Sequence, residues 1–165
     1  MGKESADIDI ALENMYGETF ANLLSDKLYP GALKQKFGVI KSNSAKSKHL
    51  ETATIRVHGV FIDLVNLRSE KYTNEGGRVP IIEFGTPEED AYRRDLTINS
   101  MFYNIKEGAV EDYTKMGESD LKLGIVRTPL EPLQTFLDDP LRVLRTIRFA
   151  TRFDFRIDQD ILPAA

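Results

Sequence analysis

Alternating apolar and polar residues near the start of the chain predict a short strand that carries two acids on one face. In the stretch ADIDIAL, Asp7 and Asp9 alternate with Ile8 and Ile10. Because successive side chains of a strand point to opposite faces, the two carboxylates share one face and the isoleucines share the other. We expect the isoleucines to point into a core.

The same patterns predict further helices and strands along the chain. Residues 17–28 have apolar side chains at helical spacing, and Thr86 followed by Pro87 is typical of a helix start. The stretches TATIRV and GVFIDLVNL, separated by His58-Gly59, predict a hairpin. A second hairpin is expected around Lys106-Glu107-Gly108, between residues 102–105 and 109–113.

The stretch TFLDDPLRVLRTIRFATRF predicts one strongly patterned helix, capped by Asp138 or Asp139 and opened by Pro140. At 100° per residue, one face is apolar and the other basic. The apolar residues are Val143, Leu144, Ile147 and Ala150, and the basic ones are Arg142, Arg145, Arg148 and Arg152. No acid of the helix body pairs with these arginines, so the row is either a solvated surface or the binding site of a polyanion.

The start of this helix also offers groups that suit a nucleobase. Asp139 and Arg142 are three residues apart, so their side chains can meet at the helix start. An acceptor beside a planar fork of donors is what reading a base edge requires.

Composition narrows the chemistry. The 165 residues suffice for one domain and the beginning of a second, and no apolar run approaches the ~20 residues that cross a bilayer. The absence of cysteine excludes disulfides, thiolate zinc sites and a cysteine nucleophile. The net charge of −4 argues against general polyanion binding, although lysines and arginines cluster locally.

Two more groups of residues carry candidate chemistry. Asp63 lies in an apolar strand and would add a third carboxylate to the first pair, although it could instead face water at a hairpin edge. Oxygen ligands of this kind suit Mg²⁺, and three carboxylates around one point suit two divalent ions about 4 Å apart. In the stretch AYRRDLTINS, Arg93 and Arg94 match a triphosphate, and Asp95 and Asn99 match sugar hydroxyls. The alternative is a solvated helix end.

In this order, the segments resemble the class II tRNA nucleotidyltransferases of the DNA polymerase β-like superfamily. These are the CCA-adding enzymes and their bacterial poly(A) polymerase relatives, and the likeness is greatest to the eukaryotic members. The segments that carry the resemblance are ESADIDIAL, FIDLVNLRSEKY, FGTPEEDAYRRDLTINSMFYNI, VEDYTKMGESDLKLGIVRTPL and TFLDDPLRVLRTIRFATRF.

The resemblance implies a fold and domains. The fold class is α+β: a nucleotidyltransferase head with a mixed β-sheet flanked by helices, followed by the start of an α-helical neck. The head is expected over residues 1–130 and the neck over 131–165, with a hinge-like motif at 112–120.

The resemblance also implies roles for single residues. Asp7 and Asp9 correspond to the metal-binding pair and Asp63 to the third catalytic acid. Arg93, Arg94, Asp95 and Asn99 correspond to a motif that holds the ribose and triphosphate of the incoming nucleotide. Asp139 and Arg142 correspond to residues that pair with the Watson–Crick edge of CTP or ATP. Arg145 and Arg148 would extend the basic face towards phosphates or the tRNA acceptor end.

The implied activity is template-independent addition of CCA to the 3′ end of tRNA from CTP and ATP, by phosphoryl transfer with two Mg²⁺ ions. Alternatives are a poly(A) polymerase, an enzyme that adds only CC or A, and a catalytically dead RNA- or nucleotide-binding module. A sugar-nucleotide transferase would leave the arginine helix unexplained.

Two departures from the family pattern lie at the ends of the chain. The Gly-Gly strand and turn that precede the paired acids in the family are missing, and the chain stops at Ala165, inside the expected neck. We therefore expect a fragment with little or no activity alone, which incorporation of radiolabelled CTP and ATP would test. The expected partners are the tRNA acceptor end, CTP and ATP, and no association with a membrane is expected. The expected location is the cytoplasm, with nucleus, mitochondria and other organelles as alternatives.

Overall fold

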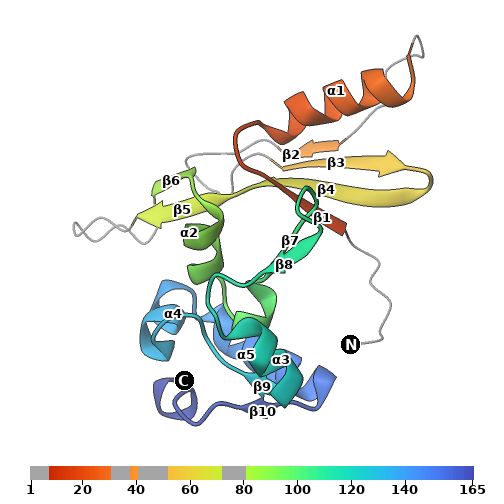
Figure 1. The fold of residues 1–165 in the computed structure, drawn as a ribbon. Coiled ribbons are helices and arrows are strands. Elements are labelled where there is room, and N and C mark those ends of the chain that lie inside the picture. The colour runs from red at the N-terminus through yellow and green to blue at the C-terminus, as the bar shows by residue number, and fades with distance from the viewer. Residues whose placement is uncertain (1–7, 31–37, 41–51, 72–80) are drawn as a thin grey trace. The chain divides into compact units, whose positions relative to one another are not determined.

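The computed structural model describes residues 8–30, 38–40, 52–71 and 81–165, which fall into two compact units, Met1–Thr86 and Pro87–Ala165. Figure 1 shows the order of the elements along the chain. The predicted Asp7 lies outside the described residues. The expected boundary between head and neck at residue 130 differs from the division into units and stays a prediction.

The first unit is built on a four-stranded mixed sheet in the order β1-β4-β3-β2. Strand β1 (Ile8–Leu12) pairs in parallel with β4 (Val60–Asn66), while β3 (Thr52–Val57) is antiparallel to both β4 and β2 (Gly38–Ile40). The prediction of a mixed sheet with flanking helices is confirmed.

Helix α1 (Gly17–Leu28) lies along one face of this sheet (Figure 1) and has the predicted bounds. The core between them consists of Leu12, Ala21, Ala53, Ile55 and Leu64. The helix begins at a glycine because the backbone there is very close to the sheet. A Cβ at Gly17 would lie 3.0 Å from the carbonyl oxygen of Leu64 and 3.1 Å from the Cβ of Ala53.

The first predicted hairpin is confirmed, and its turn explains the dipeptide between the strands. His58 and Gly59 both have positive φ, 47° and 88°. Two consecutive residues of this kind match the right-handed twist of the strands in a tight hairpin. The turn thereby aligns β4 against β3. The unit also contains an antiparallel pair formed by β5 (Arg68–Lys71) and β6 (Ile81–Phe84).

The second unit consists of short elements around Leu96, Val126 and Ala150, with Ile98, Phe149, Phe155 and Ile157 packed against them. Its first half holds α2 (Pro87–Tyr92), η1 (Thr97–Asn99), β7 (Phe102–Asn104) and β8 (Ala109–Glu111). The rest is α3 (Gly117–Leu123), β9 (Ile125–Val126), α4 (Pro132–Asp138), α5 (Leu141–Phe153), β10 (Arg156–Ile157) and η2 (Leu162–Ala164). Strands β7 and β8 form the second predicted hairpin.

The helix predicted to open at Pro140 is confirmed as α5, and the residues before it in the same stretch form a separate helix, α4. Helix α4 ends at Asp138 and α5 begins at Leu141, because Asp139 is extended, with φ −151° and ψ 100°. A residue that precedes proline is sterically pushed out of the helical region, which accounts for the break before Pro140.

The predicted apolar face of α5 is only partly turned into the core of the unit. Leu144 is 64% exposed and Ile147 is 50% exposed, whereas Thr146 and Ala150 are buried. The arginine side of the helix makes hydrogen bonds within the unit, as described below. No helix among the described residues has the length and apolar character needed to cross a membrane.

Candidate functional site

Two predicted acids are neighbours in the sheet of the first unit. In the parallel register of β1 and β4, Asp9 is the partner of Asp63. Directly opposed residues of paired strands point to the same face, so both carboxylates lie on one side of the sheet. On the next strand, Thr54 is opposite Asp63 and its hydroxyl donates a 2.6 Å hydrogen bond to Asp63 Oδ1. Asp63 is therefore held beside Asp9 and does not lie at a free hairpin edge.

This arrangement fits a hard divalent cation in its donor set. Carboxylate oxygens from adjacent strands are ligands of the kind that Mg²⁺ prefers. Among the described residues, no group of three acids or histidines gathers closely enough to hold a metal. Asp9 and Asp63 supply two carboxylates, and the expected third belongs to Asp7.

In the second unit, a buried acid holds both arginines of the predicted triphosphate motif. The Asp90 side chain is 1% exposed. One of its oxygens accepts a 2.9 Å hydrogen bond from Arg93 Nε, and the other accepts a 2.9 Å hydrogen bond from Arg94 Nε. The Arg94 guanidinium also donates to the carbonyl oxygen of Asn99 at 2.8 Å and lies over the Phe102 ring. The two guanidinium groups are thus oriented before any anion binds.

Asp90 was not predicted from the sequence. A signal was present, because Asp90 lies three residues before Arg93 and four before Arg94. On a helix, side chains at these two spacings share a face, so one carboxylate can pair with both arginines.

The next two predicted residues form a hydrogen-bonded turn. Asp95 Oδ1 accepts hydrogen bonds from the backbone N–H of Leu96, at 2.9 Å, and from Asn99 Nδ2, at 3.2 Å. The Asp95 side chain is only 6% exposed. The two side chains proposed to recognise sugar hydroxyls therefore lie together and fix each other.

Helix α5 brings Arg142 against this segment. The guanidinium donates a 2.7 Å hydrogen bond to the carbonyl oxygen of Arg93 and a 3.4 Å hydrogen bond to that of Thr135. A guanidinium carries five N–H donors, so donors remain for a ligand. The structure thus unites the two predicted nucleotide motifs of the second unit, which lie 49 residues apart in the chain.

Asp139 lies between α4 and α5 and directly precedes Pro140, the N-cap residue of α5. Its Oδ1 accepts the backbone N–H of Leu141 at 3.1 Å, and its carbonyl oxygen accepts that of Arg142 at 3.0 Å. The two side chains that were expected to meet are linked here through the backbone, since the Arg142 guanidinium contacts carbonyl oxygens instead.

The other arginines of α5 have different surroundings. Arg145 Nε donates a 2.6 Å hydrogen bond to Asp95 Oδ2. Arg148 is exposed, and its guanidinium lies 5.2 Å from the centre of the Phe149 ring. As expected, no acid of the helix body pairs with the row, but Arg145 is paired with an acid 50 residues upstream.

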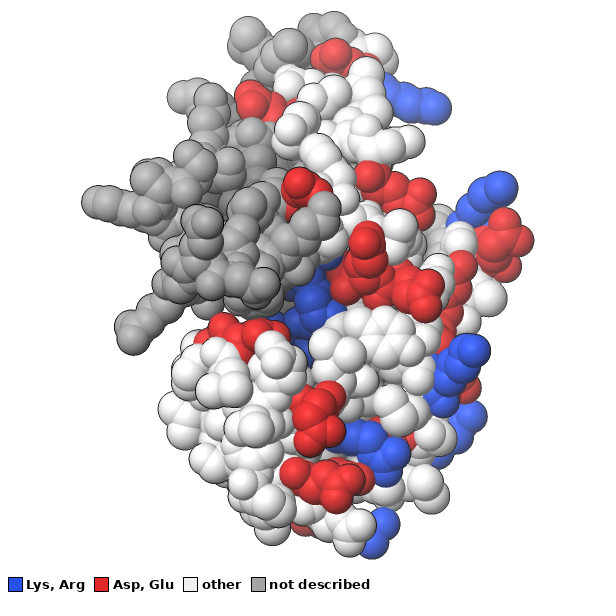
Figure 2. All heavy atoms as spheres, turned by 90° about the vertical axis from the view of Figure 1, so that its left-hand side faces the viewer, with Lys and Arg blue, Asp and Glu red and all other residues white. Residues whose placement is uncertain are grey.

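On the face drawn in Figure 2, basic and acidic side chains of the described residues are interspersed, without a broad basic surface.

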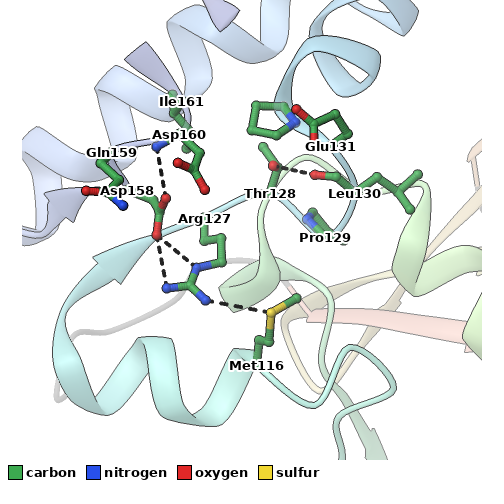
Figure 3. A pocket seen from close by; sticks show the side chains of 11 residues that line it. Met116, Arg127, Thr128, Pro129, Leu130, Glu131, Asp158, Gln159, Asp160 and Ile161 are labelled. Carbon is green, nitrogen blue, oxygen red and sulfur yellow. Dashed lines mark hydrogen bonds and ion pairs between the residues drawn. The ribbon is translucent and has the colours of Figure 1, made fainter. Parts of the chain in front are cut away.

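A pocket of about 420 Å³ in the second unit is lined by none of the predicted site residues (Figure 3). There Arg127 pairs with Asp158 at 3.0 Å and donates to the Met116 sulfur, tying α3 to the end of the chain.

Comparison with known proteins identifies the family. Residues 1–127 match the family described as the poly A polymerase head domain. The chain belongs to this family. The match spans both the β1–β4 acids and the Arg93–Asn99 segment, and it ends before α4.

Individual relatives of this head domain carry more specific names. The chain is 56% identical to the CCA tRNA nucleotidyltransferase, mitochondrial, of Saccharomyces cerevisiae, over 98% of its own length and 30% of the relative's. A solved CCA-adding enzyme in an apo form has a TM-score of 0.76 and 32% identity, over 98% of this chain and 35% of that one. A tRNA nucleotidyltransferase solved with a primer tRNA and an incoming ATP analog has a TM-score of 0.69 and 26% identity, over 99% and 41%.

The chain therefore spans about a third of the length of the relatives that it matches. The nucleotidyltransferase head that the sequence predicted, with its eukaryotic likeness, is confirmed. Nucleotidyltransferases of this family generally use a divalent metal.

Proposed function

We propose that the protein containing this chain adds CCA to the 3′ end of tRNA, using CTP and ATP. The observation that carries the proposal is the hydrogen bond from Arg142 to the backbone of Arg93. Through this bond the arginine proposed to read the base contacts the segment that carries two oriented guanidinium groups and a carboxylate–amide pair. Relatives named as CCA-adding enzymes support the same activity.

Each group has a task in this reaction. Arg93 and Arg94 would hold the triphosphate, since their forks match phosphate oxygens. Asp95 and Asn99 would recognise the ribose. Free donors of Arg142, with the Asp139 carboxylate just before the same helix, would accept only a base edge that satisfies them, because an unmatched edge leaves polar groups unpaired. Arg148, on the same helix, would extend the basic face towards phosphates or the tRNA acceptor end.

Asp7, Asp9 and Asp63 would hold two Mg²⁺ ions. When bound, such ions supply activation of the attacking 3′-hydroxyl and stabilisation of the departing pyrophosphate. The hydroxyl of Thr54 holds the Asp63 carboxylate in place beside Asp9.

The domain organisation proposed from the sequence is a head over 1–130 and the start of a neck over 131–165. On this view α4 and α5 belong to the neck and carry the base-reading arginine. The tRNA acceptor end, CTP and ATP are the proposed partners. The name of the yeast relative supports a mitochondrial address, and a cytoplasmic or nuclear pool stays a prediction.

A second candidate is poly(A) synthesis, which the description of the matching family favours. The two activities differ in product. On a tRNA that lacks its CCA end, a CCA-adding enzyme uses both CTP and ATP and stops after three nucleotides, whereas a poly(A) polymerase uses ATP and continues.

The deciding experiment supplies the full-length protein with Mg²⁺, a tRNA without CCA and each radiolabelled nucleotide in turn. We expect incorporation of C, C and A in that order, with no further extension. Long A-tracts would establish the second candidate, and a stop after CC would establish a partial-CCA enzyme. ATP binding without pyrophosphate release would identify a binding module and contradict the proposal.

A further inference from the structure

Arg145 forms an ion pair that joins the base-reading helix to the carboxylate proposed to recognise the ribose. Its Nε lies 2.6 Å from Asp95 Oδ2. The Asp95 side chain is 6% exposed, whereas that of Arg145 is 40% exposed. The carboxylate is therefore the buried partner, and this guanidinium holds its orientation.

With this ion pair formed, the Asp95 carboxylate can accept one more hydrogen bond. An ionised carboxylate has about four lone-pair positions on its two oxygens. Oδ1 accepts from the Leu96 N–H and from Asn99, and Oδ2 accepts from Arg145. One position on Oδ2 therefore remains, and its direction is fixed because both oxygens are held.

The same helix is attached to this segment a second time. Arg142, one turn before Arg145, donates to the carbonyl oxygen of Arg93, two residues before Asp95. Helix α5 thus contacts the segment through a main-chain oxygen and through a carboxylate. A shift of the helix would disturb both contacts together.

We infer that Arg145 is a positioning residue, which orients Asp95 so that its remaining lone pair accepts a hydrogen bond from a ribose hydroxyl of the bound nucleotide. This inference rests on the proposed function and deepens it. Its consequence is that recognition of the sugar depends on the helix that reads the base. A 2′-deoxynucleotide, which lacks one of the two hydroxyl donors, is the natural probe.

This role differs from direct binding of phosphate, which the position of Arg145 in the basic row also suggests. To bind a phosphate, the Arg145 guanidinium would have to break its ion pair with Asp95 or contact both groups at once. Loss of a phosphate ligand weakens CTP and dCTP alike, because their triphosphates are identical. Loss of the positioning residue weakens CTP more than dCTP.

The test compares the full-length wild type with Arg145→Met and Arg145→Lys. For each protein, kcat/KM is measured for CTP and dCTP on a tRNA without CCA, and the Kd of each nucleotide is measured by calorimetry. We expect Arg145→Met to lower the CTP-to-dCTP ratio by about tenfold or more, as removal of a hydrogen bond to a charged group does. Arg145→Lys should retain part of the preference, because it keeps the charge. Arg156→Met, which replaces an exposed arginine of β10, is the matched control.

The outcomes separate the two roles. An equal loss for both nucleotides, or an unchanged ratio, overturns the positioning role. Should Arg145→Met fail to fold in circular dichroism, the ratio in Arg145→Lys decides, and a wild-type value there overturns the inference. If the wild type binds CTP more tightly than dCTP but extends no tRNA, the proposed function fails while the Kd ratios still test the role of Arg145.

Discussion

Asp63 of β4 lies directly opposite Asp9 of β1, and Thr54 of β3 donates to it from the other side. The three residues occupy one row across adjacent strands. The sheet therefore places the two carboxylates side by side through backbone pairing alone, and the hydroxyl fixes the orientation of one of them.

This row predicts a dependence on metal concentration. In the full-length protein, Asp63→Asn should raise the Mg²⁺ concentration needed for half-maximal activity by more than the about 10–100-fold typical of losing an outer-shell partner, because it removes a charged ligand. Thr54→Val keeps the ligand and removes only its hydrogen bond, so a smaller rise is expected. Titration of activity with Mg²⁺ measures both values. Identical curves for Asp63→Asn and the wild type would remove Asp63 from the metal site.

Asp90 predicts a loss of stability. Asp90→Ala leaves the guanidinium groups of Arg93 and Arg94 without their shared partner and should lower the free energy of unfolding by about 1–3 kcal/mol. Glu88→Ala, at an exposed position of the same helix, should change it by no more than about 0.5 kcal/mol. Chemical denaturation of the three proteins measures the difference. Equal effects of the two substitutions would show that the paired arginines do not depend on Asp90.

Arg142 predicts a change in base selectivity. In the full-length protein, Arg142→Ala should lower the preference for CTP and ATP over UTP and GTP by about tenfold or more, since the lost donors no longer discriminate between base edges. Competition between labelled nucleotides on a tRNA without CCA measures the preference. Arg156→Met serves again as the control. Selectivity that survives Arg142→Ala would place base reading elsewhere.

The hydrogen bonds of Glu111 predict a lowered pKa for its carboxyl group, which a titration can measure. Hydrogen bonds from Asn104 and from the Tyr113 hydroxyl, both at 2.8 Å, hold the pKa of the Glu111 carboxyl below its ordinary value of 4.5. Because the pKa is lowered in the folded state, the stabilisation is present at neutral pH and is lost as the pH falls through the folded-state pKa.

NMR titration of the Glu111 side chain tests this directly. Asn104→Ala should raise the pKa towards 4.5 more than Tyr113→Phe does, because the amide makes the larger contribution. A Glu111 pKa at or above 4.5 in the wild type would contradict the assignment.

Local patterns predict much of this fold correctly. The bounds of α1 follow from the helical spacing of its apolar residues, and the β3–β4 hairpin follows from alternation around His58-Gly59. These features depend on neighbours in the chain, so one sequence suffices to find them. The break at Asp139 also had a local signal in Pro140.

Contacts between distant segments could not be predicted in the same way. Nothing in the spacing of α5 shows that Arg145 pairs with Asp95, because the partner lies 50 residues away and the pairing depends on how the helix docks. The exposure of Leu144 has the same origin. Hydrophobic periodicity predicts which residues share a face, whereas the hydrogen bonds of the arginines decide which face turns inward.

The contact between Arg142 and position 93 has an evolutionary consequence. The acceptor is a carbonyl oxygen, which every amino acid provides, so exchange of the side chain at position 93 would leave this tether intact. Arg145 instead depends on a carboxylate, so replacement of Asp95 would break its contact. The contact with helix α5 therefore places no demand on the side chain at position 93, whereas at position 95 it requires a carboxylate.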